Sequence, residues 1–554
     1  MKPVISVFGG HDSSISIYDP NSDRFFVIEL ERIDPEKHYF CYIHSYNRNK
    51  ITILKALRHL KRQFGIENDF SMMIMKKTCQ QTRWDSNVVE NTVKAERYCY
   101  VNTHHHVAHG WCAYLQSPYK NAIAISWDGG GDHCSFMVNG FKDNKIVWSE
   151  PRKYNFGMAY NHVGTAVESI SVKTDIIDVA GKLMGLTAYG NETENTEGYM
   201  EHLDYVASYD VNDVTSPAMI DTQRHDRKMK YLEENIPGFS TWYYLRHKKN
   251  ETKVELMKGD AEKEIAYATQ KFMETRMLEI IEKQLLDKLE NEYDNNLCLS
   301  GGCALNVLVN QAIRKRFPHL NVYVCPNPHD GGLSFGLIGD FLTRKGYVDF
   351  NKYNITYAGL RLLDDFQIPD LVKERGARET TTDEMVSMIR EGKIIGFCQG
   401  TSEIGPRALG NRSILCNPEI PDMKDILNSK VKFREWYRPF APICRLEDAP
   451  TYFESPTFEN METMSFVADV KEEYKDKLPS ITHVDGTARL QTVTETSNPL
   501  MYEILTKFGG VMLNTSFNVQ GQPILNRATD ALMVLDKTGM DNVVLEHEGT
   551  LYLF

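Results

Sequence analysis

Two histidines with helical spacing are the first residues of this sequence that could do chemistry. His105 and His109 stand four positions apart in the segment HHVAHGWCAYL, so on a helix their side chains share one face. Seventeen histidines in 554 residues give about 0.5 such pairs by chance, so the spacing needs support. Asp128, after the next β-type run, and Asp330, in a later glycine turn, would complete a His2Asp2 set suited to Zn²⁺, Fe²⁺ or Mn²⁺. His106 replaces the glutamate of H-E-x-x-H, which disfavours a zinc peptidase.

Basic and hydroxyl residues gather in the second half of the chain. The candidates in and after the segment EIGPRALGNRS are Arg407, Lys432, Arg438, Arg489, Thr515 and Ser516. Arginine pairs bidentately with phosphate and carboxylate oxygens, so this group suits a phosphorylated or carboxylated small molecule. The alternative is a solvated helix face with ion pairs to nearby glutamates. Arg489 adjoins apolar strand-type residues, where a buried cation needs an anionic partner, and this favours ligand binding.

Glycine turns between strands and helices are a third chemical signal. The segment LCLSGGCALN places Gly301 and Gly302 between an apolar strand and a helix start, and NPHDGG repeats this arrangement after 322–325. Free N–H groups and the helix dipole converge at such turns, which is the arrangement that binds nucleotide phosphates.

The elements that must position these residues follow from hydrophobic patterning. β-type runs over 4–8, 15–18 and 25–30, and again over 122–127 and 134–138, predict two hairpins with acidic, glycine-rich turns and hence a duplicated β-rich lobe. We expect a long helix from Asp260, as N-cap, to about Leu289. The charged stretch 191–260 predicts surface insertions.

Composition narrows the class of protein. The chain has 554 residues, 63 Lys plus Arg against 75 Asp plus Glu, and a net charge of −12, which predicts a compact protein of two or three domains without long-range attraction to nucleic acid or anionic lipid. Eleven cysteines without a C-x-x-C indicate a reducing compartment, and no apolar run suits a membrane span or a signal peptide. We therefore expect a cytoplasmic protein.

The ordered motifs resemble one family closely, the two-domain O-carbamoyltransferases of the antibiotic-tailoring and nodulation-factor type. The matching segments cover nearly the whole chain: GGHDSS, ELER, HHVAH, DGGGD, GKLMGLTAYG, SGGCALN, NPHDGG, EIGPRALGNRSI, KVKFREWYRPFAP, HVDGTARLQTV and LNTSFNVQGQPI. The resemblance implies an α/β fold with a duplicated actin-like ATPase (ASKHA) domain over 1–360, similar to the enzymes that attach threonylcarbamoyl to tRNA. It implies a YrdC-like α/β domain over 361–554.

The same resemblance implies two reaction centres. Carbamoyl phosphate and ATP, with Mg²⁺, would give a carbamoyl adenylate in the C-terminal domain, and the N-terminal domain would transfer the carbamoyl group to a hydroxyl. The implied catalytic residues are His105, Arg407, Lys432, Arg438, Arg489 and Ser516. The implied metal ligands, for Fe²⁺ in this family, are His105, His109, Asp128 and Asp330. The implied nucleotide-binding residues are Gly181, Lys182, Gly301, Gly302, Asn306 and Thr515.

Two other functions stay open at this point. An actin-like small-molecule kinase would share the N-terminal glycine turns but would leave the C-terminal arginines without a role, and a nucleotide-binding scaffold would need no metal. The expected partner is a small-molecule hydroxyl acceptor such as a sugar, a natural product or a modified nucleotide. A nucleic acid polymer is disfavoured because the net charge is −12. The sequence does not determine the oligomeric state.

Overall fold

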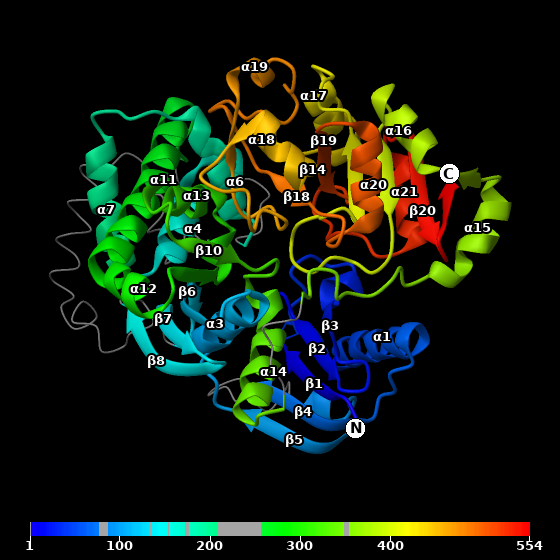
Figure 1. Cartoon of the computed structure of the whole chain (residues 1–554), viewed down its shortest axis with the longest axis horizontal. Coiled ribbons are helices and arrows are strands. Elements are labelled where there is room, and N and C mark those ends of the chain that lie inside the picture. Colours follow the sequence, from blue (N-terminus) through cyan, green and yellow to red (C-terminus); the bar gives the residue numbers. More distant parts are fainter. Residues whose placement is uncertain are drawn as a thin grey trace.

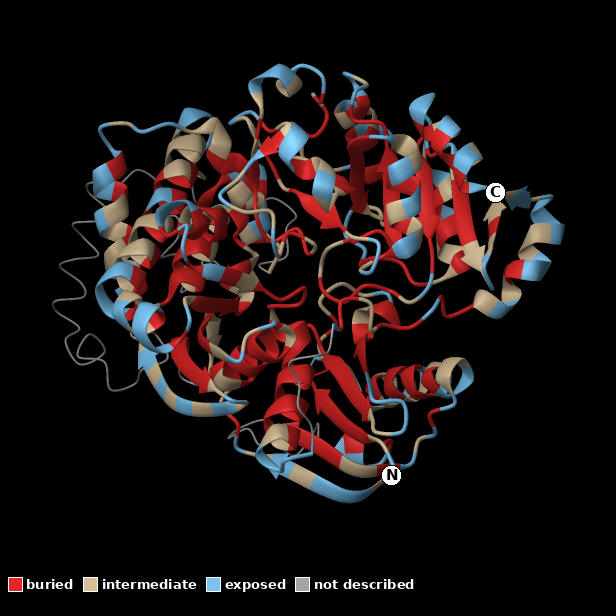
Figure 2. Cartoon of the chain, viewed as in Figure 1, coloured by how far each residue is buried: buried red, intermediate tan, exposed pale blue. Residues whose placement is uncertain are grey.

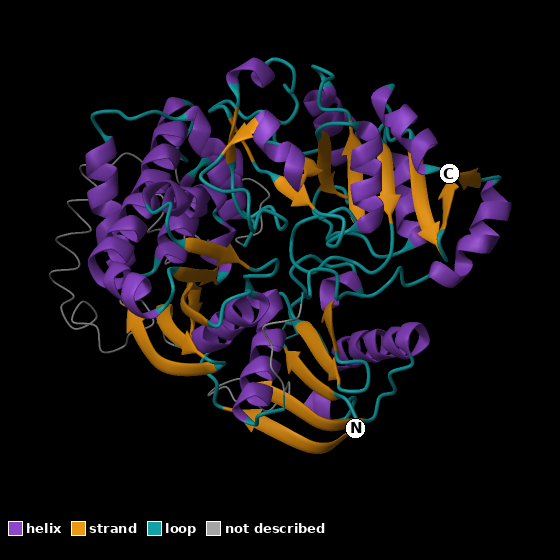
Figure 3. Cartoon of the chain, viewed as in Figure 1, coloured by secondary structure: helices purple, strands orange, loops and turns teal. Residues whose placement is uncertain are grey.

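The computed structural model describes residues 2–41, 43–76, 87–132, 134–152, 154–171, 177–208, 256–347 and 354–554. Their strands form two five-stranded sheets, an eight-stranded sheet and a three-stranded sheet (Figure 3). The fold is α/β, as expected. None of the described helices is both long enough and apolar enough to cross a membrane.

The two N-terminal sheets repeat one topology. The first has the order β3-β2-β1-β4-β5 and the second β8-β7-β6-β9-β10. In each, a three-stranded antiparallel meander is followed by two strands that run parallel to its first strand. The strands are β1 Val4–Phe8, β2 Ser14–Asp19, β3 Arg24–Glu29, β4 Phe70–Lys76, β5 Ala95–Val101, β6 Asn121–Gly131, β7 Cys134–Lys142, β8 Lys145–Arg152, β9 Asn296–Ser300 and β10 Asn321–Val324. The expected duplication and the actin-like fold class are confirmed.

Two helices pack between these sheets. α3 (His105–Gln116) contacts β6, β7 and β9, α14 (Leu333–Arg344) contacts β1 and β2, and the two helices contact each other (Figure 1). They approach closely because Gly336 lacks a side chain: a Cβ there would lie 2.0 Å from the carbonyl oxygen of Ala108. The histidine segment of α3 and the turn before α14 are thereby brought together.

The other helices of the first half cover the outer faces. They are α1 Tyr46–Phe64, α4 Phe156–Ala166, α5 Glu168–Ser171, α6 Val179–Leu186, α7 Thr196–Ser208, α11 Asp260–Ile280, α12 Leu286–Glu292 and α13 Val307–Arg316. The expected helix over 260–289 is present, but a π-helical turn at Ile281–Leu285 divides it. Gly259 occupies the N-cap position, with φ 67°, and Asp260 instead places its charge in the first turn. Most of the predicted insertion 191–260 lies outside the described residues.

The C-terminal half is built on the eight-stranded sheet. Its order is β11-β21-β20-β12-β13-β19-β14-β18, and a small sheet β15-β16-β17 lies beside it. The strands are β11 Arg378–Thr380, β12 Ile395–Cys398, β13 Arg412–Cys416, β14 Ala441–Arg445, β15 Phe453–Glu454, β16 Ala468–Val470, β17 Thr487–Ala488, β18 Gln491–Val493, β19 Met512–Ser516, β20 Asn542–His547 and β21 Thr550–Leu553. The helices are α15 Ile368–Arg375, α16 Thr382–Arg390, α17 Met423–Leu427, α18 Ala449–Tyr452, α19 Glu472–Lys475, α20 Pro499–Phe508 and α21 Ala528–Lys537.

Apolar packing joins the two halves. Tyr437, in the C-terminal half, is buried in the same cluster as Leu183 and Leu186 of α6. Buried residues continue along the central strands of all three large sheets (Figure 2). Burial of apolar surface contributes roughly 25 cal/mol per Å², so this contact stabilises the packing of α6 against the C-terminal half.

Candidate functional site

The four residues of the predicted metal set meet at one point. His105 and His109 lie on α3, Asp128 lies near the end of β6, and Asp330 lies in the turn before α14. The two Nε2 atoms are 3.1 Å apart. His109 Nε2 is 3.1 Å from Asp128 Oδ2 and 3.2 Å from Asp330 Oδ1. His105 Nε2 is 3.3 Å from Asp330 Oδ1 and 3.9 Å from Asp128 Oδ2.

These separations suit a single cation. Ligands about 2.1 Å from a tetrahedral or octahedral ion lie about 3.0–3.4 Å from one another. Asp330 Oδ1 is buried and accepts no hydrogen bond from the residues that the structure describes, a condition that a cation would relieve. Although burial opposes it, the facing carboxylates of Asp128 and Asp330 raise the pKa of His109 to about 9. The donor set therefore fits a divalent ion that accepts imidazole and carboxylate ligands.

Local structure explains how the cluster forms. The backbone N–H of His105 donates to Asp132 Oδ2 at 2.8 Å, which fixes the start of α3. Gly131 is required because a Cβ would lie 2.4 Å from the His105 ring. His106 points elsewhere: its ring nitrogens contact Ser126 Oγ at 2.7 Å and the Cys134 carbonyl oxygen at 2.9 Å. The helix thus directs the two candidate ligand histidines to the cluster and His106 to a different set of partners.

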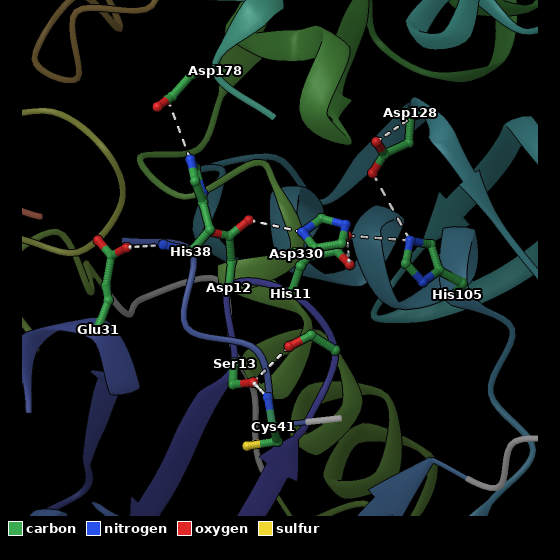
Figure 4. A network of polar contacts seen from close by, with 12 residues as sticks. His11, Asp12, Ser13, Glu31, His38, Cys41, His105, Asp128, Asp178 and Asp330 are labelled. Atoms are coloured by element: carbon green, nitrogen blue, oxygen red, sulfur yellow. Dashed lines mark hydrogen bonds and ion pairs between the residues drawn. The ribbon is translucent and has the colours of Figure 1, made fainter. Parts of the chain in front are cut away.

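A chain of acidic and imidazole groups leads away from the cluster (Figure 4). His11 Nε2 lies 3.3 Å from Asp330 Oδ2, and His11 Nδ1 lies 2.9 Å from Asp12 Oδ2. Asp12 Oδ1 contacts His38 Nδ1 at 2.7 Å, and His38 Nε2 lies 3.3 Å from Asp178 Oδ1. The charge of Asp330 is the main reason that the pKa of His11 rises to about 10. The Asp12 carboxylate therefore orients two imidazoles at once.

The sequence analysis did not assign roles to His11, Asp12 and His38. The first two belong to the GGHDSS turn, where adjacent His and Asp residues were a usable signal. His38 gave no comparable signal, because its contact with Asp12 depends on a left-handed backbone with φ 58°.

The predicted arginines line a cavity of about 170 Å³ between the two halves. Its described lining includes Arg407, Arg434, Arg438, Arg489, Asn514, Thr515 and Ser516 from the C-terminal half, and Gly181 and Gly185 from α6. We call this cavity the arginine pocket. Arg434, which lies within the segment KVKFREWYRPFAP, is a lining residue that the sequence patterns did not assign to the site.

Positive charge dominates the arginine pocket. Burial first, then the charge of Arg438, lowers the pKa of Arg407 to about 10. Burial, followed by repulsion from Arg407 and Arg438, lowers the pKa of Arg489 well below its usual value. Glu435 contacts Arg438 at 3.6 Å but also pairs with Lys182 at 2.5 Å, so it offsets only part of this charge. Such mutual repulsion is relieved by a bound polyanion.

Lys432 contacts the edge of the arginine pocket. Its Nζ donates to the Ser516 carbonyl oxygen at 2.7 Å and to Asn518 Oδ1 at 2.5 Å, and it lies 3.2 Å from Ser516 Oγ. Burial first, then Arg434 and Arg438, lowers its pKa well below the usual value. The ammonium thus fixes the end of β19, where Ser516 faces the cavity.

The predicted nucleotide-binding residues divide among several places. Gly181 lines the arginine pocket, and Lys182 pairs with Glu435. Gly302 instead approaches the metal cluster, where a Cβ would lie 3.0 Å from Asp128 Oδ1, and Gly301, with φ 85°, packs against the Trp127 backbone. Asn306 caps α13 through its side-chain oxygen and bonds to Gln270. Their role in holding a nucleotide stays a prediction.

Two family profiles match the chain. Residues 56–338 match the one described as carbamoyltransferase N-terminus, and residues 386–550 match the one described as carbamoyltransferase C-terminus.

Individual relatives are more distant. Nodulation protein NolNO of Sinorhizobium fredii is 28% identical over 478 residues, which cover 80% of this chain but only 62% of that protein. A 3'-hydroxymethylcephem-O-carbamoyltransferase of Amycolatopsis lactamdurans is 36% identical over 257 residues, covering 45% of this chain and 47% of that protein. A crystal structure of full-length HypF in the phosphate- and nucleotide-bound form aligns with 63% of this chain and 56% of its own at 12% identity, but with a TM-score of 0.33 that supports no functional conclusion.

Proposed function

The chain belongs to the carbamoyltransferase family, and from this premise we propose that it is an ATP-dependent O-carbamoyltransferase with two reaction centres. The arginine pocket would form a carbamoyl adenylate from carbamoyl phosphate and ATP. The metal cluster would transfer the carbamoyl group to the hydroxyl of a small molecule. The observation that carries the proposal is the presence, in one chain, of a pocket lined by four arginines and a separate His2Asp2 cluster.

The first centre would perform two steps. Water hydrolyses carbamoyl phosphate to carbamate and inorganic phosphate. A carbamate oxygen then attacks the α-phosphorus of ATP, which enters with Mg²⁺, and pyrophosphate leaves. Arg407, Arg438 and Arg489 would bind the phosphoryl oxygens and offset charge as it moves. Ser516 and Lys432, joined at the end of β19, would bind the small carbamoyl end of the substrate.

The second centre would use the metal cluster. His105, His109, Asp128 and Asp330 would hold an Fe²⁺, Zn²⁺ or Mn²⁺ ion, which would supply Lewis acidity toward the carbamoyl oxygen. His11 is the candidate base for the acceptor hydroxyl: its side chain is 39% exposed beside Asp330, and Asp12 orients its ring. The charge of Asp330 is the main cause of the raised pKa of His11, so a cation bound to Asp330 would lower that pKa and allow the imidazole to accept a proton. As the hydroxyl oxygen bonds to the carbamoyl carbon, the bond to AMP breaks and AMP leaves.

The two alternatives explain less of the molecule. A small-molecule kinase needs no second pocket with four arginines, and a nucleotide-binding scaffold needs no convergent ligand set. The acceptor would be a sugar, a natural product or a modified nucleotide, each of which supplies a hydroxyl.

The experiment is to incubate the protein with ATP, Mg²⁺ and carbamoyl phosphate and to identify the phosphate products. The proposal predicts pyrophosphate and AMP, whereas ADP would indicate the kinase, and no turnover would indicate the scaffold. A panel of sugar, antibiotic and nucleoside alcohols with ¹⁴C-labelled carbamoyl phosphate then identifies an acceptor by transfer of label.

A further inference from the structure

A buried acid and base at the end of β3 play no part in either centre. Glu29 is the last residue of β3, and Arg32 closes the short helical turn that follows, within the sequence segment ELER. Each is only 6% exposed. Arg32 Nε donates to Glu29 Oε2 at 3.2 Å, so the two side chains form one unit.

This unit binds both backbone groups of one distant glycine. The Gly405 N–H donates to Glu29 Oε1 at 2.9 Å, and Arg32 Nη2 donates to the Gly405 carbonyl oxygen at 2.8 Å. Arg32 Nη1 also donates to the Ile524 carbonyl oxygen at 3.4 Å. A carboxylate and a guanidinium thereby fix the position and orientation of a single peptide segment from the C-terminal half.

Gly405 also packs against the loop that precedes Asp330. Its φ is 87°, and a Cβ would lie 2.1 Å from the Pro326 carbonyl oxygen. Glu29 takes part in the same contact, because a Cβ on Gly331 would lie 3.2 Å from its Oε1. The loop 326–331, which carries a metal ligand, and the loop 405–407, which carries an arginine of the pocket, therefore meet at Glu29.

We propose that Glu29 and Arg32 are positioning residues that fix the 405–407 loop of the arginine pocket against the 326–331 loop of the metal cluster. The proposal rests on the proposed function. Its consequence is that the adenylate made in the arginine pocket reaches the metal cluster before water or another nucleophile attacks it. Correct relative placement matters because a displacement of about 1 Å can cost about 100-fold in rate.

A second buried arginine provides a matched control. Arg314, on α13, is 2% exposed, and its Nη2 donates to the Glu459 carbonyl oxygen at 2.8 Å and to the Val322 carbonyl oxygen at 3.0 Å. It therefore joins the same two halves by the same chemistry but contacts neither the 405–407 loop nor Asp330. If the substitutions act only by loosening the packing between the halves, replacing Arg32 and replacing Arg314 should have equal effects.

The experiment compares Glu29→Gln, Arg32→Lys and Arg314→Lys in the full chain. Glutamine keeps one acceptor but loses the charge, and lysine cannot reach Glu29, Gly405 and Ile524 together. Two measurements are made. Hydrogen–deuterium exchange reports on peptides covering 325–332 and 403–412. Hydroxylamine, added with ATP and carbamoyl phosphate, reports on escaped adenylate, because its nitrogen displaces AMP from the carbamoyl carbon and gives hydroxyurea.

We expect Glu29→Gln and Arg32→Lys to speed exchange in both peptides and to raise hydroxyurea per pyrophosphate by about fivefold. The ratio corrects for any change in the rate of adenylate formation. Arg314→Lys should change neither the exchange of these peptides nor the ratio. Unchanged exchange, an unchanged ratio, or an equal effect of Arg314→Lys would overturn the inference. Absence of pyrophosphate from the unsubstituted chain would instead refute the proposed function, and the exchange data would still decide whether the residues position the loops.

Discussion

The metal cluster and the arginine pocket solve opposite electrostatic problems. In the cluster, two carboxylates and two imidazoles converge within 4.8 Å, so negative charge is concentrated where a cation can bind. In the arginine pocket, burial first and then repulsion between the cations lower the pKa values of Arg407 and Arg489. We therefore expect each centre to be stabilised by a ligand of the opposite charge. Because the two centres differ in charge, we expect that adenylate formation and carbamoyl transfer can be separated by substitutions in one centre and by ligands that bind only one of them.

The largest effect is expected for His109→Ala. Loss of a ligand should remove the ion, and with it several kcal/mol of transition-state stabilisation, so transfer should fall by about 1000-fold. Pyrophosphate release should stay within about twofold. Transfer of label to an accepted alcohol and pyrophosphate release are measured side by side, with bound iron determined on the same samples.

His106→Gln is the matched control for this prediction. Its ring contacts Ser126 and the Cys134 carbonyl oxygen rather than the cluster, so transfer should persist. If His109→Ala abolishes pyrophosphate release as well, the separation of the two centres is wrong.

The next effect is expected for Arg489→Met. Removing one charged donor from the arginine pocket should slow pyrophosphate release by about 100-fold, because charge on the transferring phosphoryl group loses a partner. Iron content should not change. Arg445→Lys is the control, since Arg445 pairs with Asp448 away from the pocket and should stay within about twofold. Equal losses in both variants would contradict the assignment of the pocket.

A smaller effect is expected for His38→Gln. His38 contacts Asp12, which orients His11, so its loss should misplace the candidate base and reduce transfer by about tenfold. The readout is kcat for transfer against the KM for the acceptor, with pyrophosphate release as internal reference. A change in pyrophosphate release alone would place His38 with the other centre.

The smallest effect is on thermal stability. Pyrophosphate at about five times its Kd should stabilise the protein by about 1 kcal/mol, and Arg489→Met should remove this gain. Fe²⁺ should also raise the Tm, and His109→Ala should remove that gain instead. Scanning fluorimetry of each variant, Arg489→Met and His109→Ala, with each ligand, pyrophosphate and Fe²⁺, tests the comparison. A stabilisation by pyrophosphate that is lost in His109→Ala would contradict two separate centres.

Sequence patterns predicted the parts whose signals are local. The i, i+4 spacing of His105 and His109 and the repeated hairpins required only helix and strand periodicity, and both appear in the structure. The resemblance added the pairing of distant ligands such as Asp128 and Asp330. The nucleotide-binding set stays a prediction, because a glycine such as Gly301 can permit close packing against Trp127 as readily as it can bind a phosphate.

The remaining contacts could not be predicted from local patterns. Glu29 and Gly405 are 376 positions apart, and their contact exists only because the two halves pack against each other. His38 contacts Asp12 through a left-handed backbone, which is uncommon for a residue other than glycine and which local sequence patterns do not predict. Long-range contacts of this kind determine how the two centres are connected. Local sequence patterns indicate only which residues belong to each centre.

The most direct test of the two-centre account supplies synthetic carbamoyl adenylate and an accepted alcohol to Arg489→Met and to His109→Ala. If the two centres are separate, Arg489→Met should transfer the carbamoyl group at a rate close to that of the unsubstituted protein, and His109→Ala should not transfer it. Failure of Arg489→Met to use the adenylate, or transfer by His109→Ala, would contradict the account.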